Sequence, residues 1–313
     1  MDRLLLVANP AASGFTGGLH RSVCRVLSRR WEVEPAWPQS AEHACSLTAE
    51  AVQSGCRLVV AMGGDGIVHH VAQAVAGTET VLGIIPVGTA NVLARLTELP
   101  RRPTAVAKML ASGFDVRSVP VLWVTATDGD GRASRWVTLF ALGIGHDAEI
   151  VRRAEAEPYR KYRFGSLHYA RTALSTVWSE LRRVPHRLHL EADGITADTG
   201  GLMVQFHDAY THFGRRPLRL GPRGADPMAL LAIDALRLRR APSILRRVLT
   251  GDGMSGVKGI RVWTGIRHAV VRADEPVLAQ ADGELRGRWL EFDLRLEERG
   301  LGVATPPLPP GRG

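Results

Sequence analysis

The sequence predicts a two-domain protein, in which an α/β domain built on a layered parallel sheet precedes a mostly β domain that forms an antiparallel sandwich. The chain has 313 residues, enough for two domains of ordinary size. Its first 125 residues alternate short apolar runs with helical stretches, whereas the remainder carries mainly strand-like runs. With 45% hydrophobic and 23% charged residues, the composition excludes an intrinsically disordered chain.

The first domain, expected at residues 1–125, contains short runs that are either apolar or alternating, as strands are. These runs lie at Leu4–Ala8, Trp31–Trp37, Arg57–Met62 and Val81–Ile85. Helices are expected at Leu19–Arg29, Ala41–Ser54, Val68–Ala76 and Asn91–Leu96. Gly55 and Gly77 directly follow two of these helices, and glycine commonly ends a helix. Strands that alternate with helices predict parallel pairing.

The second domain is expected at residues 126–289. Ser118–Thr127 and Arg135–Leu142 predict a hairpin around the turn Asp128-Gly129-Asp130-Gly131. A helix is expected at Gly165–Leu181. Further strands are expected at Leu188–Ala192, Leu202–Phe206, Leu230–Ala235, Gly259–Thr264, Ala269–Arg272 and Leu290–Leu296. The tail at residues 305–313 contains four prolines and is expected to be disordered.

Charge and cysteine content restrict the environment of the chain. The formal net charge is +9, which fits either a polyanionic partner or a compositional bias toward arginine. An odd number of cysteines without a C-x-x-C motif argues against disulfides and favours a reducing cytoplasm. The N-terminus lacks the basic region of a signal peptide. No apolar run approaches the ~18 residues that would span a bilayer, so we expect a cytoplasmic protein whose membrane contact is peripheral.

The most informative local motif is Gly63-Gly64-Asp65-Gly66, between a predicted strand and a predicted helix. Glycines let backbone N–H groups approach an anion, and the helix N-terminus adds positive potential. Asp65 could then organise Mg²⁺ or a hydroxyl. Alternatively, the four residues form a plain strand-to-helix turn in which Asp65 caps the helix.

Two other loops follow predicted strands, and parallel order would bring them to the same edge of the sheet. Asn9-Pro10 continues through small residues to Ser13-Gly14, and Pro86-Val87-Gly88-Thr89-Ala90-Asn91 offers hydroxyl and amide groups to phosphate oxygens. Ligands of open α/β sheets bind at this edge. Far downstream, Gln280-Ala281-Asp282-Gly283-Glu284 forms an acidic loop between two predicted strands.

In order and spacing, the three loops and the late Asp282-Gly283-Glu284 resemble the superfamily of diacylglycerol and sphingosine kinases over roughly residues 3–303. Phe140–Ala148 and Lys161–Tyr169 also resemble the middle region of that family. The Gly-Gly-Asp-Gly motif alone is shared with NAD kinases. The late Asp-Gly-Glu and the mostly β second half disfavour an NAD-kinase-like enzyme.

The resemblance implies an NAD-kinase-like and diacylglycerol-kinase-like fold that binds ATP and Mg²⁺ in a cleft between the two domains. It implies phosphorylation of a lipid alcohol such as diacylglycerol or a sphingoid base, with Glu284 as the general base and Asp282 beside it as a catalytic residue together with Asp65. It also implies that residues 290–303 return to the first domain. The implied nucleotide contacts are Asn9, Pro10, Ser13, Gly14, Gly63, Gly64, Asp65, Gly66, Gly88, Thr89 and Asn91.

Several positions depart from the pattern of that family. Ile67, His69 and His70 occupy positions where the family usually has Thr, Asn and Glu. Pro38 stands where a threonine commonly touches the nucleotide. These departures bear on ATP affinity, and they favour an alternative in which the chain is a nucleotide-binding homologue with weak or no activity and a regulatory or binding role.

One further departure concerns a structural metal. Met228 aligns with an aspartate that supports a structural Mg²⁺ in the family, and Asp226 could replace it as a ligand only with a two-residue slip. Outside these motifs, Gly143–Ala148 matches G-x-G-x-x-A, but it does not open a βαβ unit. A dinucleotide site is therefore not expected there.

The expected partners are a lipid alcohol substrate and an anionic membrane surface. Nine arginines lie between Arg215 and Arg247, which predicts either a face for anionic headgroups or an ordinary solvated face. Nucleic acid is not expected, because no aromatic platform is interleaved with the arginines. The apolar stripe of Gly165–Leu181 suits either the core or a pocket for an acyl chain. The sequence leaves the oligomeric state open, with a homodimer as one option.

Overall fold

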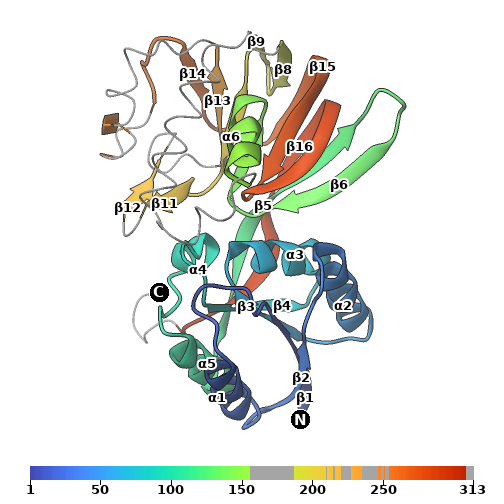
Figure 1. Ribbon diagram of the computed structural model, residues 1–313. Coiled ribbons are helices and arrows are strands. Elements are labelled where there is room, and N and C mark those ends of the chain that lie inside the picture. Colours follow the sequence, from blue (N-terminus) through green and yellow to red (C-terminus); the bar gives the residue numbers. More distant parts are fainter. Residues whose placement is uncertain are drawn as a thin grey trace. The chain divides into compact units, whose positions relative to one another are not determined.

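The computed structural model describes residues 1–155, 187–208, 210–213, 216–219, 227–234, 246–247, 250 and 254–307. The chain divides into two compact units (Figure 1). The first comprises Met1–Val121 and the C-terminal segment from Glu297, and the second comprises Leu122–Leu296. Two long strands, β5 (Asp115–Thr127) and β16 (Glu284–Thr305), contribute residues to both units.

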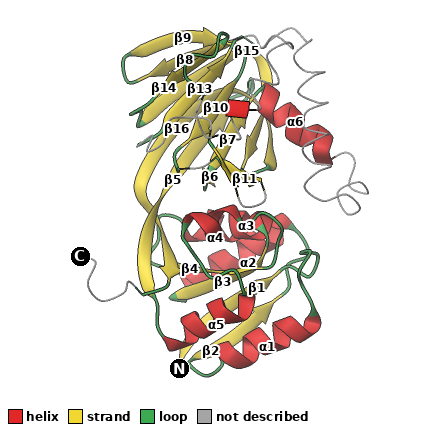
Figure 2. Cartoon of the chain, turned by 90° about the vertical axis from the view of Figure 1, so that its left-hand side faces the viewer, coloured by secondary structure: helices red, strands yellow, loops and turns green. Residues whose placement is uncertain are grey.

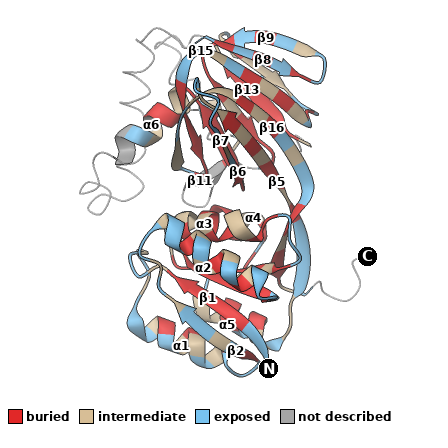
Figure 3. Ribbon diagram, turned by 90° about the vertical axis from the view of Figure 1, so that its right-hand side faces the viewer, coloured by how far each residue is buried: buried red, intermediate tan, exposed pale blue. Residues whose placement is uncertain are grey.

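The first unit is built on a parallel sheet in the order β2-β1-β3-β4, as the alternating pattern predicts. Its strands are β1 (Asp2–Ala8), β2 (Trp31–Ala36), β3 (Leu58–Gly63) and β4 (Val81–Pro86). The last part of β16 extends the sheet beside β4, where Val303 pairs in parallel with Leu82. Strands β1, β3 and β4 are buried along most of their length (Figure 3), as parallel strands between two helical layers are.

Helices cover both faces of this sheet (Figure 2), with α1 and α5 together on one face and α2 and α3 on the other. The helices are α1 (Gly17–Leu27), α2 (Ala41–Gln53), α3 (Asp65–Val75), α4 (Val92–Leu96) and α5 (Pro103–Ser112). Thr16 and Ser40 cap α1 and α2, each accepting a hydrogen bond of 3.1 Å from a backbone N–H of the first turn. The α/β class predicted for this region is confirmed.

In the first unit, helices α3 and α5 differ most from the sequence-based expectation. The helix expected from Val68 begins at Asp65, because Gly64 serves as its N-cap and an acidic side chain in the first turn suits the helix dipole. Helix α5 was missed, although Pro103 at its first turn and Gly113 after its last residue are typical helix boundary signals. This helix contributes Leu110, whose carbonyl accepts a hydrogen bond of 2.9 Å from the buried indole of Trp31.

The second unit consists mostly of antiparallel strands, which confirms the predicted class. Its further strands are β6 (Ala133–Thr138), β7 (Ala141–Ile144), β8 (Leu188–Ala192), β9 (Ile195–Thr199), β10 (Leu202–Gln205), β11 (Thr211–Phe213), β12 (Arg216–Leu218), β13 (Ala229–Ile233), β14 (Ile260–Trp263) and β15 (His268–Ala281). Helix α6 (His146–Glu155) follows β7. Strand β15 pairs with β8 through Ala269–Ala273 and with β7 through Ala279–Ala281. The pairing of β15 with β16 shifts its register between Arg272 and Val277, and this shift separates the two halves of β15. Each half therefore pairs with different strands around one shared core.

The expected second strand of the hairpin, Arg135–Leu142, is wrong as a single element. It is two strands, because β6 ends at Thr138 and pairs with β5, whereas β7 begins at Ala141 and pairs with β10 and β15. Strands β15 and β16 are also longer than expected, and β9, β11, β12 and helix α6 were missed.

Some expectations lie outside the described residues. The expected helix Gly165–Leu181 is one of them, and so is the tail beyond residue 307; Thr305, where the tail was expected to begin, is the last residue of β16. Among the described helices, none combines the length and the apolar character needed to cross a membrane.

Candidate active site

The loops that follow β1, β3 and β4 meet at the carboxyl edge of the first unit's sheet. The strands end together, since Ala8 lies beside Met62 and Gly63 beside Pro86. Backbone hydrogen bonds then join the loops: Asn9 N donates to Met62 O (2.9 Å), Gly14 N to Val87 O (2.8 Å) and Val87 N to Gly63 O (2.9 Å). The structure thus brings together the three loops that the sequence singled out.

Close approach of neighbouring atoms, mostly backbone, requires glycine at several positions of these loops. A Cβ atom at Gly88 would lie 2.4 Å from the Cα of Gly64, and one at Gly14 would lie 2.9 Å from the carbonyl oxygen of Val87. A Cβ at Gly63 would lie 2.3 Å from a methyl group of Ile67. Gly64 has φ −96°, so its backbone conformation is open to any residue and the need for glycine there is one of space. The glycines allow the three loops to pack directly against one another.

Two hydroxyl groups and one helix N-terminus are presented at this edge. Ser13 Oγ lies 3.3 Å from Thr89 Oγ1, and both residues are exposed. Helix α3 begins with Gly64 as N-cap and has no side-chain cap hydrogen bond. Hydroxyl donors beside the positive end of a helix form a setting that binds phosphate groups.

Three of the predicted site residues hold the loops in place. Asn9 Oδ1 accepts a hydrogen bond from Ala11 N (2.9 Å). Asn91, in a left-handed conformation, closes the third loop, because its Oδ1 accepts from Gly88 N (3.1 Å) and its Nδ2 donates to Gly88 O (2.7 Å). Asp65 Oδ1 accepts from Val92 N (2.6 Å), so its carboxylate caps α4 as well as standing in the first turn of α3. Their contact with nucleotide remains a prediction.

Two further predicted nucleotide contacts, Pro10 and Gly66, belong to the same loop motifs. Pro10 lies exposed in the first loop, and Gly66 lies in the first turn of α3.

Arg95 was missed by sequence reasoning, although it lies one helical turn after Asn91 on α4. Its guanidinium donates to the carbonyl of Thr89 at 3.4 Å, which places a cation beside the third loop. Burial lowers the pKa of Arg95 below its usual value, repulsion from Arg101 acts in the same direction, and the Asp65 carboxylate opposes both. The group remains a cation, and it can neutralise charge on a bound phosphate.

The departures in α3 are packing positions. Ile67 and His69 are buried, and the His69 side chain is 0% exposed. The ring Nε2 of His69 lies 3.2 Å from Gln73 Nε2. His70 is partly buried, and its carbonyl accepts from the Cys45 thiol at 3.3 Å. Pro38 lies just after β2. Helix α3 therefore uses residues 67 and 69 for packing, and the effect of these departures on ATP affinity stays a prediction.

The acidic motif forms the two-residue turn between β15 and β16, flanked by the pair Ala281 and Glu284. Asp282 has φ 56° and Gly283 has φ 88°, as the type I′ turns that join twisted strands require. The Asp282 residue is only 6% exposed. Its side chain anchors it in that turn.

The carboxylate of Asp282 accepts three backbone hydrogen bonds. They come from Leu139 N (2.8 Å) and Phe140 N (2.9 Å), which lie between β6 and β7, and from Ala141 N (3.1 Å), the first residue of β7. This contact explains why the expected strand is broken at Leu139. It also ties the turn to the interior of the unit and gives Asp282 an organising role beside Glu284, which is partly exposed at the start of β16.

Comparison with known proteins places the chain in a family. Residues 3–134 match the family model described as diacylglycerol kinase catalytic domain. A relative from Xanthomonas oryzae pv. oryzae (strain MAFF 311018), named "Probable lipid kinase YegS-like", is 32% identical over 251 residues, 75% of this chain and 75% of the relative. The chain belongs to the diacylglycerol kinase family of lipid kinases. The resemblance carried by the glycine loops and the late acidic turn is thereby confirmed.

A second relative matches over a shorter stretch. A protein of Mycobacterium tuberculosis (strain CDC 1551 / Oshkosh) named "Diacylglycerol kinase" is 32% identical over 181 residues, 57% of this chain. The match spans 56% of that relative's length, little more than half.

Solved structures show the same fold at low sequence identity. A diacylglycerol kinase from Bacillus anthracis str. Sterne superposes with a TM-score of 0.68 at 16% identity and covers 98% of this chain and 97% of its own. An NAD kinase from Archaeoglobus fulgidus in complex with ATP gives a TM-score of 0.52 at 16% identity, covering 97% of this chain and 94% of its own. The predicted fold shared by lipid kinases and NAD kinases is confirmed.

The described residues of this diacylglycerol kinase family member do not fit a structural Mg²⁺ site. Met228 is fully buried in the core of the second unit, and a thioether is no ligand for a cation that prefers oxygen. Asp226, the expected substitute, lies outside the described residues. Among the residues that are described, no group of three or more His, Cys, Asp and Glu side chains is arranged to hold a metal.

Proposed function

We propose that this chain transfers the γ-phosphoryl group of ATP to a hydroxyl of a lipid alcohol such as diacylglycerol or a sphingoid base. The observation that carries the proposal is the convergence of the three glycine-rich loops at one sheet edge, in a chain that also holds an acidic turn through the three hydrogen bonds of Asp282. The names of its relatives support the same chemistry.

The residues of the first unit would bind the nucleotide. Backbone N–H groups at the start of α3, the hydroxyls of Ser13 and Thr89, and the guanidinium of Arg95 suit the oxygens of the phosphate chain. Mg²⁺ would enter as part of the Mg–ATP substrate. Phosphoryl transfer depends mainly on such positioning and charge neutralisation.

Glu284 would act as the general base toward the lipid. As the hydroxyl oxygen forms its bond to the γ-phosphorus, the bond from that phosphorus to the β,γ-bridging oxygen breaks and ADP leaves. The hydroxyl proton passes to the Glu284 carboxylate, which must therefore be ionised and within hydrogen-bond reach of the acceptor.

A lipid acceptor requires an approach to a membrane surface, so peripheral attachment to anionic lipid in the cytoplasm is part of the proposal. The net charge of +9 supports attraction to such a surface. Most of the arginines between Arg215 and Arg247 lie outside the described residues. Of those described, Arg219 pairs with Asp208 and Arg247 donates to Ser255 O at 3.0 Å.

The test is phosphate transfer from ATP labelled at the γ position to a panel of lipid alcohols in vesicles that contain anionic lipid. We expect the label in the organic phase as a lipid phosphate, with diacylglycerol and sphingoid bases compared directly. Omission of Mg²⁺ should stop the reaction, because the nucleotide would then lack its counterion. Nucleotide binding without transfer to any lipid in the panel would overturn the proposal and favour a binding or regulatory role.

A further inference from the structure

A buried hydrogen-bonded cluster lies next to the acidic turn and is formed by Asp147, Tyr210 and Gln280. Asp147 stands in the first turn of α6, and Gln280 stands in β15 two residues before Asp282. The Tyr210 hydroxyl donates to Asp147 Oδ2 at 2.7 Å, and Gln280 Nε2 lies 2.6 Å from the same oxygen. Gln280 Nε2 also lies 3.0 Å from the Tyr210 hydroxyl. The three side chains thus form a closed triangle.

The triangle is enclosed within the second unit. Tyr210 is 9% exposed and Gln280 is 2% exposed. The carboxylate of Asp147 lies over Gly143, where a Cβ atom would be 2.0 Å from Oδ2, so only glycine at position 143 leaves it room. Burial raises the pKa of Asp147, and hydrogen bonds from Tyr210 and Gln280 oppose that rise. The pKa of Tyr210 is raised well above its usual value, first by burial and then by Asp147, so its hydroxyl keeps its proton.

Asp147 determines which way the amide of Gln280 faces. Asp147 Oδ2 accepts the hydrogen bond of the Tyr210 hydroxyl, and the Gln280 amide turns its Nε2 group toward the same oxygen. The opposite end of the amide then presents Oε1 to Gly283 N, from which it accepts a hydrogen bond of 2.9 Å. The contact with Asp147 thus orients the Gln280 amide so that its oxygen holds the N–H group of Gly283, the residue before Glu284.

We propose that Asp147, Tyr210 and Gln280 are positioning residues for catalysis, which hold the Gly283 peptide and so set the direction of the Glu284 carboxylate. This inference rests on the proposed function. Asp282 fixes one side of the turn through three N–H groups, and Gln280 fixes the other side through Gly283. A base displaced by about 1 Å can lose on the order of 100-fold in rate, so a turn held on both sides matters to turnover.

A reversal of hydrogen-bond polarity tests the proposal. Gln280→Glu places a carboxyl group at position 280 against the carboxyl group of Asp147, so the amide donor is lost. We expect kcat to fall about 100-fold while the KM for ATP stays the same. The double variant Asp147→Asn with Gln280→Glu restores a donor opposite an acceptor, and the new carboxylate at position 280 can still accept from Gly283. The Tyr210 hydroxyl both donates and accepts, so it can serve the reversed pair. We therefore expect kcat to recover to within about fivefold of wild type.

Three further variants separate positioning from stability. Tyr210→Phe keeps the ring and removes one hydrogen bond, so a folded protein with a several-fold lower kcat is expected. Thr199→Val removes a buried hydrogen bond to Gly201 O (3.0 Å) elsewhere in the same unit, and it should lower the unfolding temperature without changing kcat. Hydrogen exchange at the Gly283 amide reports the contact directly, and it should speed up in Gln280→Leu.

The possible results are distinct. If the double variant is no more active than Gln280→Glu alone, or if all variants keep the kcat of wild type, the positioning role is overturned. Loss of amide protection at Gly283 with unchanged turnover also overturns it. A wild-type protein that transfers no phosphate to any lipid overturns the proposed function itself, and this inference with it.

Discussion

The three glycine-rich loops of the first unit and the acidic turn of the second unit are held by different kinds of contact. The loops are joined by backbone hydrogen bonds between chain segments that approach closely because Gly14, Gly64 and Gly88 have no side chain. The acidic turn is held by buried side chains, with Asp282 and Gln280 each contacting backbone N–H groups. We therefore expect the loops of the first unit to be disrupted when a side chain is added at one of these glycines. The acidic turn should be disrupted when one of its buried side chains is removed.

Among the variants that test this comparison, the largest effect on ATP binding is expected from Gly88→Ala. The new Cβ would lie 2.4 Å from Gly64 Cα and 2.9 Å from Asn91 Oδ1, so the loops must separate. We expect ATP binding to weaken at least about 100-fold, because backbone donors aimed at phosphate lose their geometry. Calorimetric titration with Mg–ATP measures it.

Gly18→Ala is the matched control, since no atom lies within 4 Å of a Cβ at that position in α1. It should bind ATP as wild type does. Equal affinity in Gly88→Ala would show that close packing of the loops has no bearing on the nucleotide.

The second effect in size concerns Asp282→Ala. Three buried N–H groups at the corner between β6 and β7 would lose their carboxylate acceptor, and we expect the free energy of unfolding to fall by about 3 kcal/mol. ATP binding, which the first unit would supply, should persist. Denaturant unfolding followed with and without Mg–ATP measures both quantities.

Asp130→Ala, at an exposed position of the hairpin turn, is the control for loss of a carboxylate. A stability change in Asp282→Ala no larger than in this control would contradict the role assigned to the three hydrogen bonds.

A smaller effect is expected from Asp65→Ala, which removes the acceptor for Val92 N at the start of α4. Loss of a helix cap costs about 1 kcal/mol. ATP affinity should fall less than in Gly88→Ala, because α4 can shift without separating the loops. A loss of affinity as large as that of Gly88→Ala would instead indicate direct contact between Asp65 and the nucleotide or its metal.

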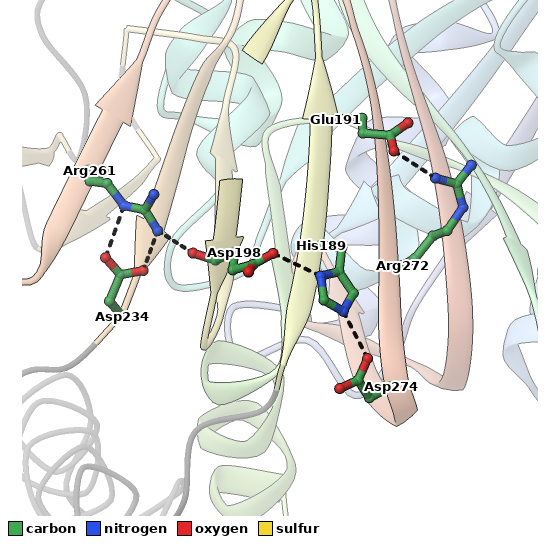
Figure 4. Close-up of polar contacts among 7 residues, drawn as sticks. All are labelled: His189, Glu191, Asp198, Asp234, Arg261, Arg272 and Asp274. Carbon is green, nitrogen blue, oxygen red and sulfur yellow. Dashed lines mark hydrogen bonds and ion pairs between the residues drawn. The ribbon is translucent and has the colours of Figure 1, made fainter. Parts of the chain in front are cut away.

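The smallest effect lies on the surface of the second unit, where His189 stands between two carboxylates (Figure 4). Its Nδ1 is 2.8 Å from Asp198 and its Nε2 is 2.8 Å from Asp274. Hydrogen bonds to Asp274 and then Asp198 raise the pKa of His189. The stabilisation is therefore complete below the unfolded pKa of about 6.5 and is lost as the pH rises through the higher folded value.

Because His189 is exposed, this contribution is expected to be slight. Unfolding midpoints of wild type and His189→Gln should differ at pH 5 and converge by pH 9. Parallel curves over that range would show that the pair of carboxylates does not stabilise the charged ring.

The two regions also differ in how far the sequence predicts them. Gly63-Gly64-Asp65-Gly66 and its companion loops are contiguous motifs at strand ends, so their convergence follows from parallel pairing alone. Asp147, Tyr210 and Gln280 are distant in sequence and carry no common pattern, so only the fold brings them together. The break at Leu139 was equally invisible, because the carboxylate that causes it lies 143 residues downstream.

The central claim is that Glu284 accepts the proton of a lipid hydroxyl during phosphate transfer from ATP. The most direct measurement is the single-turnover rate of transfer at saturating Mg–ATP in wild type, in Glu284→Gln and in the exposed control Glu275→Gln. We predict that Glu284→Gln lowers the rate about 10²–10⁴-fold while its affinity for ATP stays within about twofold of wild type, and that Glu275→Gln changes neither. A Glu284→Gln rate within a few-fold of wild type would contradict the account.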